Sequence, residues 1–218
     1  MIPESNDLIL AAGMPRSAST WLFNAARILL SDAIGEEFSC GWIGDLNRIP
    51  QKNCMLIKLH EYDHLLVQQS RYIMYSFRDI RDAIASNYRK FGEIPCMEEA
   101  DYLIYQYEKW ASVADFIMRY ESMITDKISI IKKLGEDLEI YQFSPEEIIQ
   151  RIKELSYENE GEKNIKYHRV NLYHPGHITD GRYGSWNGFI DPELIKKIEI
   201  KYKHWFVKCG YPLNYCSV

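Results

Sequence analysis

The chain alternates between short, continuous apolar runs and longer segments with helical spacing. Residues 8–12, 55–59 and 72–77 are nearly continuous apolar runs, which are typical of strands buried on both faces of a parallel sheet. Gly13 and a loop follow the first run, and residues 19–30 then carry apolar side chains on one helical stripe. The pattern predicts an α/β fold that begins with strand, loop and helix.

The second half of the chain is predicted to be mostly helical. One apolar stripe covers residues 100–114, and Ser144-Pro145-Glu146-Glu147 has the composition of a capping box with proline at the first helical position. Asp191-Pro192-Glu193 opens another helix, whose inward residues continue to Phe206. Between these helices, residues 156–186 are polar and too long for a passive connection, so we expect a flap there.

Length and charge narrow the class of protein. The 218 residues fit a single domain over residues 1–218, and the formal net charge of −5 disfavours broad binding to nucleic acid or an anionic membrane. No apolar run approaches the ~20 residues that span a bilayer, and the first residues do not resemble a signal peptide. We therefore expect a cytoplasmic protein. The five cysteines have no CxxC spacing, which favours free thiols over disulfides or a zinc site.

Residues 13–20, Gly-Met-Pro-Arg-Ser-Ala-Ser-Thr, occupy the position of a phosphate-binding loop between a strand and a helix. Compared with the pattern G-x-x-x-x-G-K-[ST], the segment has Ala18 in place of the second glycine and Ser19 in place of the lysine. The run 72–77 ends in Arg78, where a triphosphate-binding protein has an acidic residue that helps to hold Mg²⁺. The loop, with Arg16 in it, predicts an anion site without the apparatus for a metal-bound triphosphate.

A second anion site is predicted around Arg78. The inward face of the helix that follows is expected to carry Ile80, Ala83, Ile84 and Tyr88. Ser86 lies on another face with Asp82 and Arg89. Because helical side chains tilt toward the N-terminus, Arg78 and Ser86 can flank one phosphate near the positive end of the helix. In the alternative interpretation, Arg78 pairs with Asp79 or Asp82 as an ordinary charge.

Together, the two loops resemble those of the PAPS-dependent sulfotransferases, whose donor is 3′-phosphoadenosine-5′-phosphosulfate. The first loop of that family is similar to residues 15–21, Pro-Arg-Ser-Ala-Ser-Thr-Trp. Its second motif, R-x-x-[RK]-D-x-x-x-S, is matched at every stated position by residues 78–86. Residues 119–123, Arg-Tyr-Glu-Ser-Met, and the glycine-rich residues 181–186 resemble two later segments of the family. The resemblance spans roughly residues 8–210.

The resemblance implies roles for the residues of the donor site. Those that would hold the 5′-phosphosulfate are Arg16, Ser17, Ala18, Ser19 and Thr20. Arg78 and Ser86 would hold the 3′-phosphate, and the late loop would add Gly181, Arg182 and Gly184. Trp21 and Tyr120 would contact the adenine, or alternatively pack as core aromatics. Many cytosolic members have Arg-Lys-Gly where this chain has Thr-Asp-Gly at 179–181, so Arg182 is the candidate for the missing basic contact.

The segment Lys58-Leu59-His60 resembles the K-x-H of the cytosolic sulfotransferases, in which the histidine is the base. Alternation along a strand places Lys58 and His60 on the same face. A histidine suits removal of a proton from an acceptor that attacks sulfur, and Arg16 and Lys58 would stabilise charge on the leaving phosphate. Glu61 is the alternative base, because other branches of the family use glutamate.

These features predict an α/β/α domain of three layers, related to the P-loop NTPases, with both anion loops at the carboxyl ends of adjacent strands. The predicted activity is transfer of the sulfuryl group of PAPS to a hydroxyl or amine of a small-molecule acceptor, releasing PAP without a metal. His174 or His177 is expected to line the acceptor pocket. The alternatives are a small-molecule kinase of related topology, which the missing lysine and acidic residue disfavour, and a non-catalytic module that binds adenosine bisphosphate.

Overall fold

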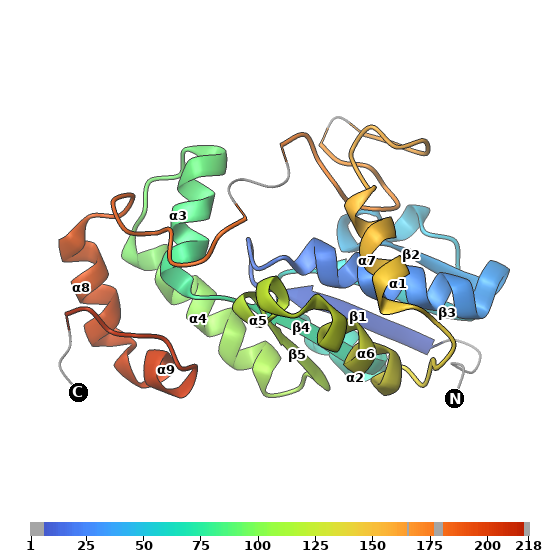
Figure 1. Ribbon diagram of the computed structural model, residues 1–218, viewed down its shortest axis with the longest axis horizontal. Coiled ribbons are helices and arrows are strands. Elements are labelled where there is room, and N and C mark those ends of the chain that lie inside the picture. Colours follow the sequence, from blue (N-terminus) through green and yellow to red (C-terminus); the bar gives the residue numbers. More distant parts are fainter. Residues whose placement is uncertain (1–6, 165, 177–180, 216–218) are drawn as a thin grey trace.

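The computed structural model describes residues 7–164, 166–176 and 181–215 (Figure 1). The strands in these residues are β1 (Asp7–Gly13), β2 (Phe38–Trp42), β3 (Cys54–Leu59), β4 (Ser70–Phe77) and β5 (Phe116–Arg119). They form a sheet in the order β2-β3-β1-β4-β5, and each neighbouring pair is parallel. The predicted short parallel sheet is therefore confirmed.

Helices connect the strands and complete the chain. The longer ones are α1 (Ser19–Ile34), α3 (Ile80–Phe91), α4 (Met97–Ala111), α6 (Lys127–Asp137), α7 (Pro145–Lys153) and α8 (Pro192–Lys201). The shorter ones are α2 (His64–Gln69), α5 (Tyr120–Thr125), α9 (Lys203–Lys208) and the 3₁₀ turns η1 (Gly35–Glu37) and η2 (Ile43–Arg48).

The helices cover both faces of the sheet, as the continuous apolar strands require. On β1, Leu10 and Ala12 join a core with α3, α4, α8 and α9, whereas Ile9 and Ala11 join a core with α1, α6 and α7. The three layers follow from this alternation and confirm the predicted α/β/α class. Figure 1 shows α8 and α9 beside α3 and α4 at one end of the molecule.

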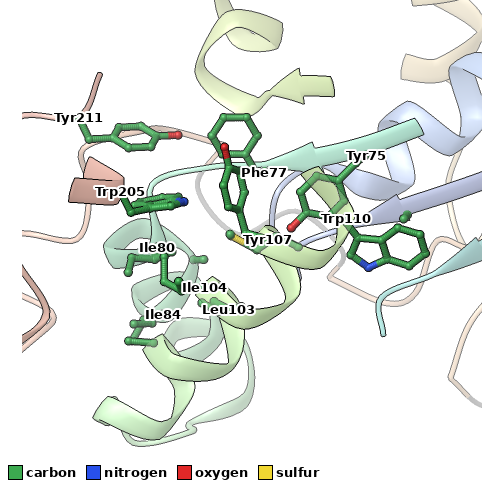
Figure 2. Close-up of a cluster of buried hydrophobic side chains, with 14 of the residues drawn as sticks. Tyr75, Phe77, Ile80, Ile84, Leu103, Ile104, Tyr107, Trp110, Trp205 and Tyr211 are labelled. Atoms are coloured by element: carbon green, nitrogen blue, oxygen red, sulfur yellow. The ribbon is translucent and has the colours of Figure 1, made fainter. Parts of the chain in front are cut away.

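Aromatic packing connects the C-terminal helices to the centre of the sheet. Trp205 of α9 lies edge-on to Tyr107 of α4, with ring centroids 5.4 Å apart, and stacks on Tyr211 (Figure 2). Trp110 packs near Tyr75 of β4, and its indole Nε1 donates a hydrogen bond to the carbonyl oxygen of His60 at 2.9 Å. The core therefore positions the backbone at the end of β3.

Several expected elements differ in the structure. Strands β2 and β5 were not predicted, because each is a short edge strand, of five and four residues. The helix expected to continue to Phe206 breaks at Tyr202, whose ψ of 23° is not helical, so that α8 and α9 are separate. Tyr88 is 43% exposed and does not face the core, because the buried part of α3 ends at Ser86. Helix α4 ends at Ala111, before Ala114.

The described parts of the expected flap lie in two places. Residues 156–164 and 166–176 lie over α1 and β2, and residues 181–190 lie beside α3 and α8 (Figure 1). Asn24 of α1 donates to the carbonyl oxygen of Asn171 at 2.7 Å, and the Tyr167 hydroxyl donates to Asp45 at 2.6 Å. In the described ranges, no helix is long and apolar enough to cross a membrane.

Candidate active site

A cavity of about 630 Å³ opens where β3, β1 and β4 end. The register places Ala12 of β1 opposite Leu59 of β3, and Gly13 opposite Ser76 of β4, so that the residues following the three strands lie close together. Its walls include the loop 15–20, the end of β3, Arg78 after β4, and residues of α3, α5, the segment 167–174 and Gly181. The two predicted anion sites and the predicted Lys58–His60 pair meet in this cavity.

The loop between β1 and α1 is shaped by close contacts and by left-handed backbone. A Cβ on Gly13 would lie 2.4 Å from Ser19 Cβ and 2.5 Å from Ser76 Oγ, so only glycine fits there. Arg16 and Ala18 have φ values of 66° and 61°. Left-handed residues in a turn line up backbone N–H groups around an anion, and the first N–H groups of α1 have no partners within the helix. The loop therefore has the backbone geometry of an anion-binding turn.

Within this loop, Ser17 points away from the cavity. Its side chain is fully buried, donates to the carbonyl oxygen of Met14 at 2.7 Å and lies 2.7 Å from the Ser76 hydroxyl. The side chain therefore fastens the loop to β4 instead of facing a ligand, which differs from the role expected for it. Ala18, Ser19, Thr20 and Trp21 do line the cavity.

Lys58 and His60 lie on the same face at the end of β3, as strand alternation predicted. Lys58 Nζ is 3.3 Å from His60 Nε2, and His60 Nδ1 is 2.6 Å from the carbonyl oxygen of Gly13. Because a carbonyl can only accept, Nδ1 carries the proton and Nε2 presents its lone pair. Trp42 packs against both side chains, with its ring 5.4 Å from the imidazole and 5.1 Å from Lys58 Nζ.

Burial changes the protonation of this pair. Removal from water lowers the pKa of Lys58 to about 7. The pKa of His60 is lowered to about 3 by burial first, and then by the positive charges of Lys58 and Arg16. His60 is therefore a neutral imidazole near pH 7. Glu61, the alternative base, is exposed and is not among the residues that line the cavity.

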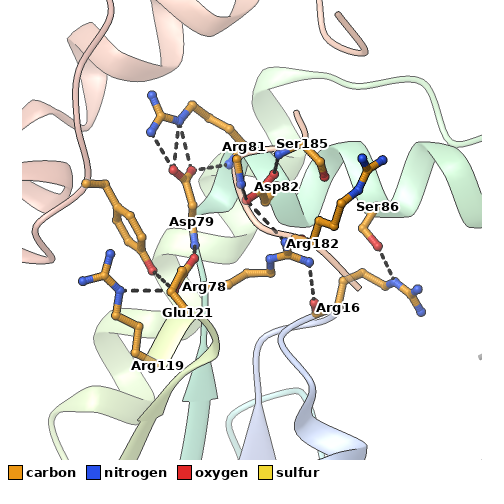
Figure 3. Close-up of polar contacts among 12 residues, drawn as sticks. Arg16, Arg78, Asp79, Arg81, Asp82, Ser86, Arg119, Glu121, Arg182 and Ser185 are labelled. Atoms are coloured by element: carbon orange, nitrogen blue, oxygen red, sulfur yellow. Dashed lines mark hydrogen bonds and ion pairs between the residues drawn. The ribbon is translucent and has the colours of Figure 1, made fainter. Parts of the chain in front are cut away.

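Arg78 lies at the centre of the second anion site (Figure 3). The residue is 3% exposed, and its guanidinium donates to the carbonyl oxygens of Arg16 at 3.1 Å and Arg182 at 2.9 Å. It also pairs with Asp82 at 3.3 Å and lies 4.1 Å from the ring centre of Tyr120. Its buried Nε has no hydrogen-bond partner among the described residues. The alternative interpretation is confirmed in that Arg78 pairs with Asp82, and its role in an anion site stays a prediction to which the unpartnered Nε is suited.

The second site is continuous with the first. Arg16 Nε donates to Ser86 Oγ at 3.0 Å, which joins the loop after β1 to α3. Burial and the nearby charge of Arg78 lower the pKa of Arg16. Tyr120, at the start of α5, lines the cavity and is also largely buried. Packing in the core is therefore compatible with a position in the cavity wall. The cationic side chains of Lys58, Arg16 and Arg78, at or after the ends of β3, β1 and β4, thus lie around one cavity.

The late loop reaches this site mainly through its backbone. Gly181 lines the cavity, and the carbonyl oxygen of Arg182 accepts the hydrogen bond from Arg78. Gly184 is not in the cavity wall, and its N–H donates to Asp82 at 2.6 Å. Residues 179 and 180 lie outside the described residues.

Sequence reasoning missed other parts of the wall. The cavity-lining residues that no motif indicated are Trp42, Asn87, Phe91, Glu93, Ile124, Lys127, Tyr167, Leu172 and Tyr173. Trp42 would have been found if β2 had been recognised, because the ends of parallel strands line such sites. Tyr167, Leu172 and Tyr173 belong to the segment expected to be a flap.

Among the remaining predictions, His174 lines the cavity, and its pKa is lowered by burial first and then by nearby cations that include Arg16 and Lys58. His177 lies outside the described residues. In the part of the chain that the structure describes, no group of three or more His, Cys, Asp or Glu residues is arranged to hold a metal ion.

Comparison with known proteins identifies related sequences and folds. The family described as "Sulfotransferase domain" matches residues 45–210, a region that begins after the loop 13–20. Mouse sulfotransferase SULT7A1, solved with PAP, is similar in structure with a TM-score of 0.67 and 16% identity, covering 92% of this chain and 85% of that one. No curated protein sequence matches the chain.

Two structures of retinol dehydratase are also similar. One, in complex with androsterone and the inactive cofactor PAP, has a TM-score of 0.60 and 14% identity over 96% of this chain and 82% of that one. The other, in a complex with retinol and PAP, has a TM-score of 0.60 and 15% identity over 98% and 84%. At these identities the likeness establishes a shared fold.

Proposed function

The chain belongs to the sulfotransferase family, and we propose that it moves the sulfuryl group of PAPS to a hydroxyl or amine of a small-molecule acceptor and releases PAP. The observation that carries this assignment is the convergence of Arg16, Arg78 and the Lys58–His60 pair in one cavity. The PAP in the similar sulfotransferase structures supports the choice of donor.

In the proposed donor site, the first turn of α1 and Arg16 hold the 5′-phosphosulfate. Ser19 and Thr20 line the cavity at the N-terminus of α1, where backbone N–H groups and the helix dipole favour an anion. The buried Nε of Arg78, together with Ser86, supplies donors for the 3′-phosphate. Trp21 and Tyr120 form the wall proposed for the adenine.

The proposed transfer uses His60 as the base. The acceptor oxygen or nitrogen attacks sulfur, the bond between sulfur and the 5′-phosphate oxygen breaks, and Nε2 of His60 takes the acceptor proton. Its position next to the anion loop, and the tautomer fixed by Gly13, favour His60 over the exposed Glu61. Lys58 and Arg16 stabilise the charge that develops on the leaving phosphate.

The acceptor is proposed to occupy the cavity next to His60. Trp42 packs against His60, and Phe91 and Tyr173 add aromatic surface to the same cavity. Such walls fit a small acceptor with an apolar body and one reactive hydroxyl or amine. We propose that the segment 156–186 acts as the flap on this side, since Tyr173 and His174 come from it.

Two measurements test this function. Calorimetric titration with PAP, 5′-AMP and ATP with Mg²⁺ reports whether the 3′-phosphate is recognised without metal, and PAP release from PAPS is followed across a panel of phenols, alcohols and amines. We expect PAP to bind far more tightly than AMP and its release to depend on an acceptor. Preference for ATP with Mg²⁺ would instead favour the kinase, and PAP binding without turnover would favour the non-catalytic module.

A further inference from the structure

One face of α3 holds the late loop against the donor site. Asp82 is 1% exposed, and its two carboxylate oxygens accept hydrogen bonds from successive backbone N–H groups of that loop: Oδ2 from Gly184 at 2.6 Å and Oδ1 from Ser185 at 2.9 Å. Figure 3 shows Asp82 between Arg78 and Ser185. Because both acceptors are buried, the loop is fixed in orientation as well as in position.

The same carboxylate is paired with the residue that we assign to the 3′-phosphate. Arg78 Nη2 lies 3.3 Å from Asp82 Oδ2 and donates to the carbonyl oxygen of Arg182 at 2.9 Å. Asp82, Arg78 and the backbone of residues 182–185 therefore form a closed network. A change at Asp82 would displace both walls of the 3′-phosphate site together.

Arg89 provides a second attachment about two turns further along the same face of α3. It lies seven residues after Asp82, close to two turns of α3, so both side chains point to the same side. Its guanidinium donates to the carbonyl oxygen of Ser185 at 3.2 Å and to the Ser185 hydroxyl at 3.1 Å, and it lies 4.7 Å from the ring centre of Phe189. Two points on α3 thus hold the loop.

Asp82 itself is not suited to touch the nucleotide. A carboxylate beside a phosphate is repulsive, and both of its oxygens already accept from the protein. Its effect on the donor must therefore act through Arg78 and the loop.

We propose that Asp82, with Arg89 as a second attachment, is a positioning residue that fixes residues 181–185 and Arg78 in the geometry that recognises the 3′-phosphate of the donor. This inference rests on the proposed function. It also explains how the loop contributes without the Arg-Lys-Gly of many cytosolic relatives: α3 holds it by its backbone.

The test compares Asp82→Asn with the wild-type protein by calorimetric titration with PAP and with 5′-AMP. The amide keeps the shape of the side chain but turns an NH₂ group toward one of the two backbone N–H groups. We expect the PAP-to-AMP affinity ratio to fall about tenfold or more, through weaker PAP binding and unchanged AMP binding. Glu99→Gln is the matched control, because Glu99 contacts α3 through Asn87 and does not touch the loop.

A second measurement does not depend on ligand. Arg182 is exposed, and cleavage by trypsin after it reports release of the loop. We expect faster cleavage in Asp82→Asn than in the wild-type protein and in Glu99→Gln. If Asp82→Asn does not fold, Arg89→Gln removes the second attachment, and a fall in the affinity ratio of about threefold is expected from the loss of its hydrogen bonds.

The outcomes separate this inference from the proposed function. A wild-type protein that prefers PAP, with variants that keep the full preference and the wild-type cleavage rate, overturns the role of Asp82 and leaves the function intact. A wild-type protein that binds PAP and AMP equally overturns the proposed donor, and this inference with it. Loss of the preference together with faster cleavage supports the positioning role.

Discussion

In the proposed mechanism, His60 takes the acceptor proton and Lys58 stabilises charge on the leaving phosphate, and burial lowers the pKa of both side chains. The Gly13 carbonyl fixes the proton on Nδ1 of His60, which leaves Nε2 able to accept a proton. Burial and two neighbouring cations keep that imidazole neutral. When the anionic donor occupies the cavity, its charge offsets those cations. We therefore expect the pKa of His60 to be higher in the donor complex than in the free protein.

Replacement of His60 tests this assignment. In His60→Gln, we expect acceptor-dependent PAP release from PAPS to fall by about 10²–10⁴-fold, the usual contribution of a general base. Calorimetric PAP affinity should stay within about threefold of wild type, because no donor contact is assigned to the imidazole. Glu61→Gln is the control and should keep its turnover. If the two variants exchange these results, the exposed carboxylate is the base.

The lowered pKa of Lys58 predicts proton uptake when PAP binds. In the free protein the ammonium loses its proton as the pH rises through about 7. A bound phosphate favours the charged form, so the pKa of Lys58 rises on binding. A proton is then taken up at pH values between the pKa in the free protein and the pKa in the complex. PAP affinity should therefore fall by up to about tenfold per pH unit above 7. Titrations at pH 8 in two buffers of different ionisation enthalpy measure the uptake.

Lys58→Met is the matched variant for that measurement. It keeps the apolar stem beside Trp42 but has no titrating group. We expect its PAP affinity to be weaker and its proton uptake at pH 8 to be smaller than in the wild-type protein. Equal uptake in both proteins would assign the linked proton to another group.

The direction of a side chain was predictable from the sequence where a local rule decides it. Strand alternation is such a rule, and it placed Lys58 and His60 together from the sequence. The direction of Ser17 depends on Ser76 of β4, which is distant in the chain, so the sequence suggested a ligand contact that the side chain does not make. Asp82 was visible in the second motif, but its attachment to Gly184 depends on a contact 102 residues away.

At the scale of elements, the loop between β1 and α1 depends on the absence of a side chain at Gly13. In Gly13→Ala, the new Cβ would overlap Ser19 and Ser76, and the loop or the start of α1 must shift. We expect the free energy of unfolding to fall by about 1–3 kcal/mol, as for overpacked sites, and PAP binding to weaken strongly. Urea denaturation and calorimetric titration measure the two effects.

Gly35→Ala separates the site effect from a general loss of stability. Gly35 has a φ of 68°, but a Cβ there meets no atom within 4 Å. With a ψ of −130°, this conformation is one that alanine rarely adopts and costs about 1–3 kcal/mol, so this variant should also be less stable, with unchanged PAP affinity. If both glycine variants bind PAP like the wild-type protein, the loop after β1 does not hold the donor.

Strands were predictable from the sequence where they form long continuous apolar runs. The three central strands are buried on both faces and therefore show as continuous runs, whereas β2 and β5 lie at the sheet edges and have five and four residues. Trp42 was missed with β2 for this reason. Helix starts were visible because capping is local: Ser144 accepts from the Glu147 N–H at 3.2 Å, and Asp191 caps α8.

At the scale of the whole molecule, the site is assembled by topology. The order β3-β1-β4 places three chain segments that are distant in sequence at one edge of the sheet, and both helical layers are attached to those strands. The alternation of strands and helices predicts a parallel sheet. In such a sheet, ligands bind at the carboxyl ends of the strands, where the strand order reverses. The route of residues 166–176 over this edge depends on specific contacts such as Tyr167 with Asp45, which no periodic pattern encodes.

Because the proposed donor site joins all three segments, PAP binding should stabilise the whole fold and not only one loop. At a free PAP concentration of 100 times its Kd, mass action adds about 2.7 kcal/mol to the free energy of unfolding, which is about 5–10 °C in Tm for a chain of this length. Thermal unfolding with PAP should show this shift, and EDTA should leave it unchanged, because only protein groups are assigned to the phosphates. An Arg78→Ala protein should lose most of the PAP shift while its shift with 5′-AMP stays like that of the wild type. A PAP shift that EDTA abolishes would require a metal in the site and would contradict the assignment of the phosphates to Arg16 and Arg78.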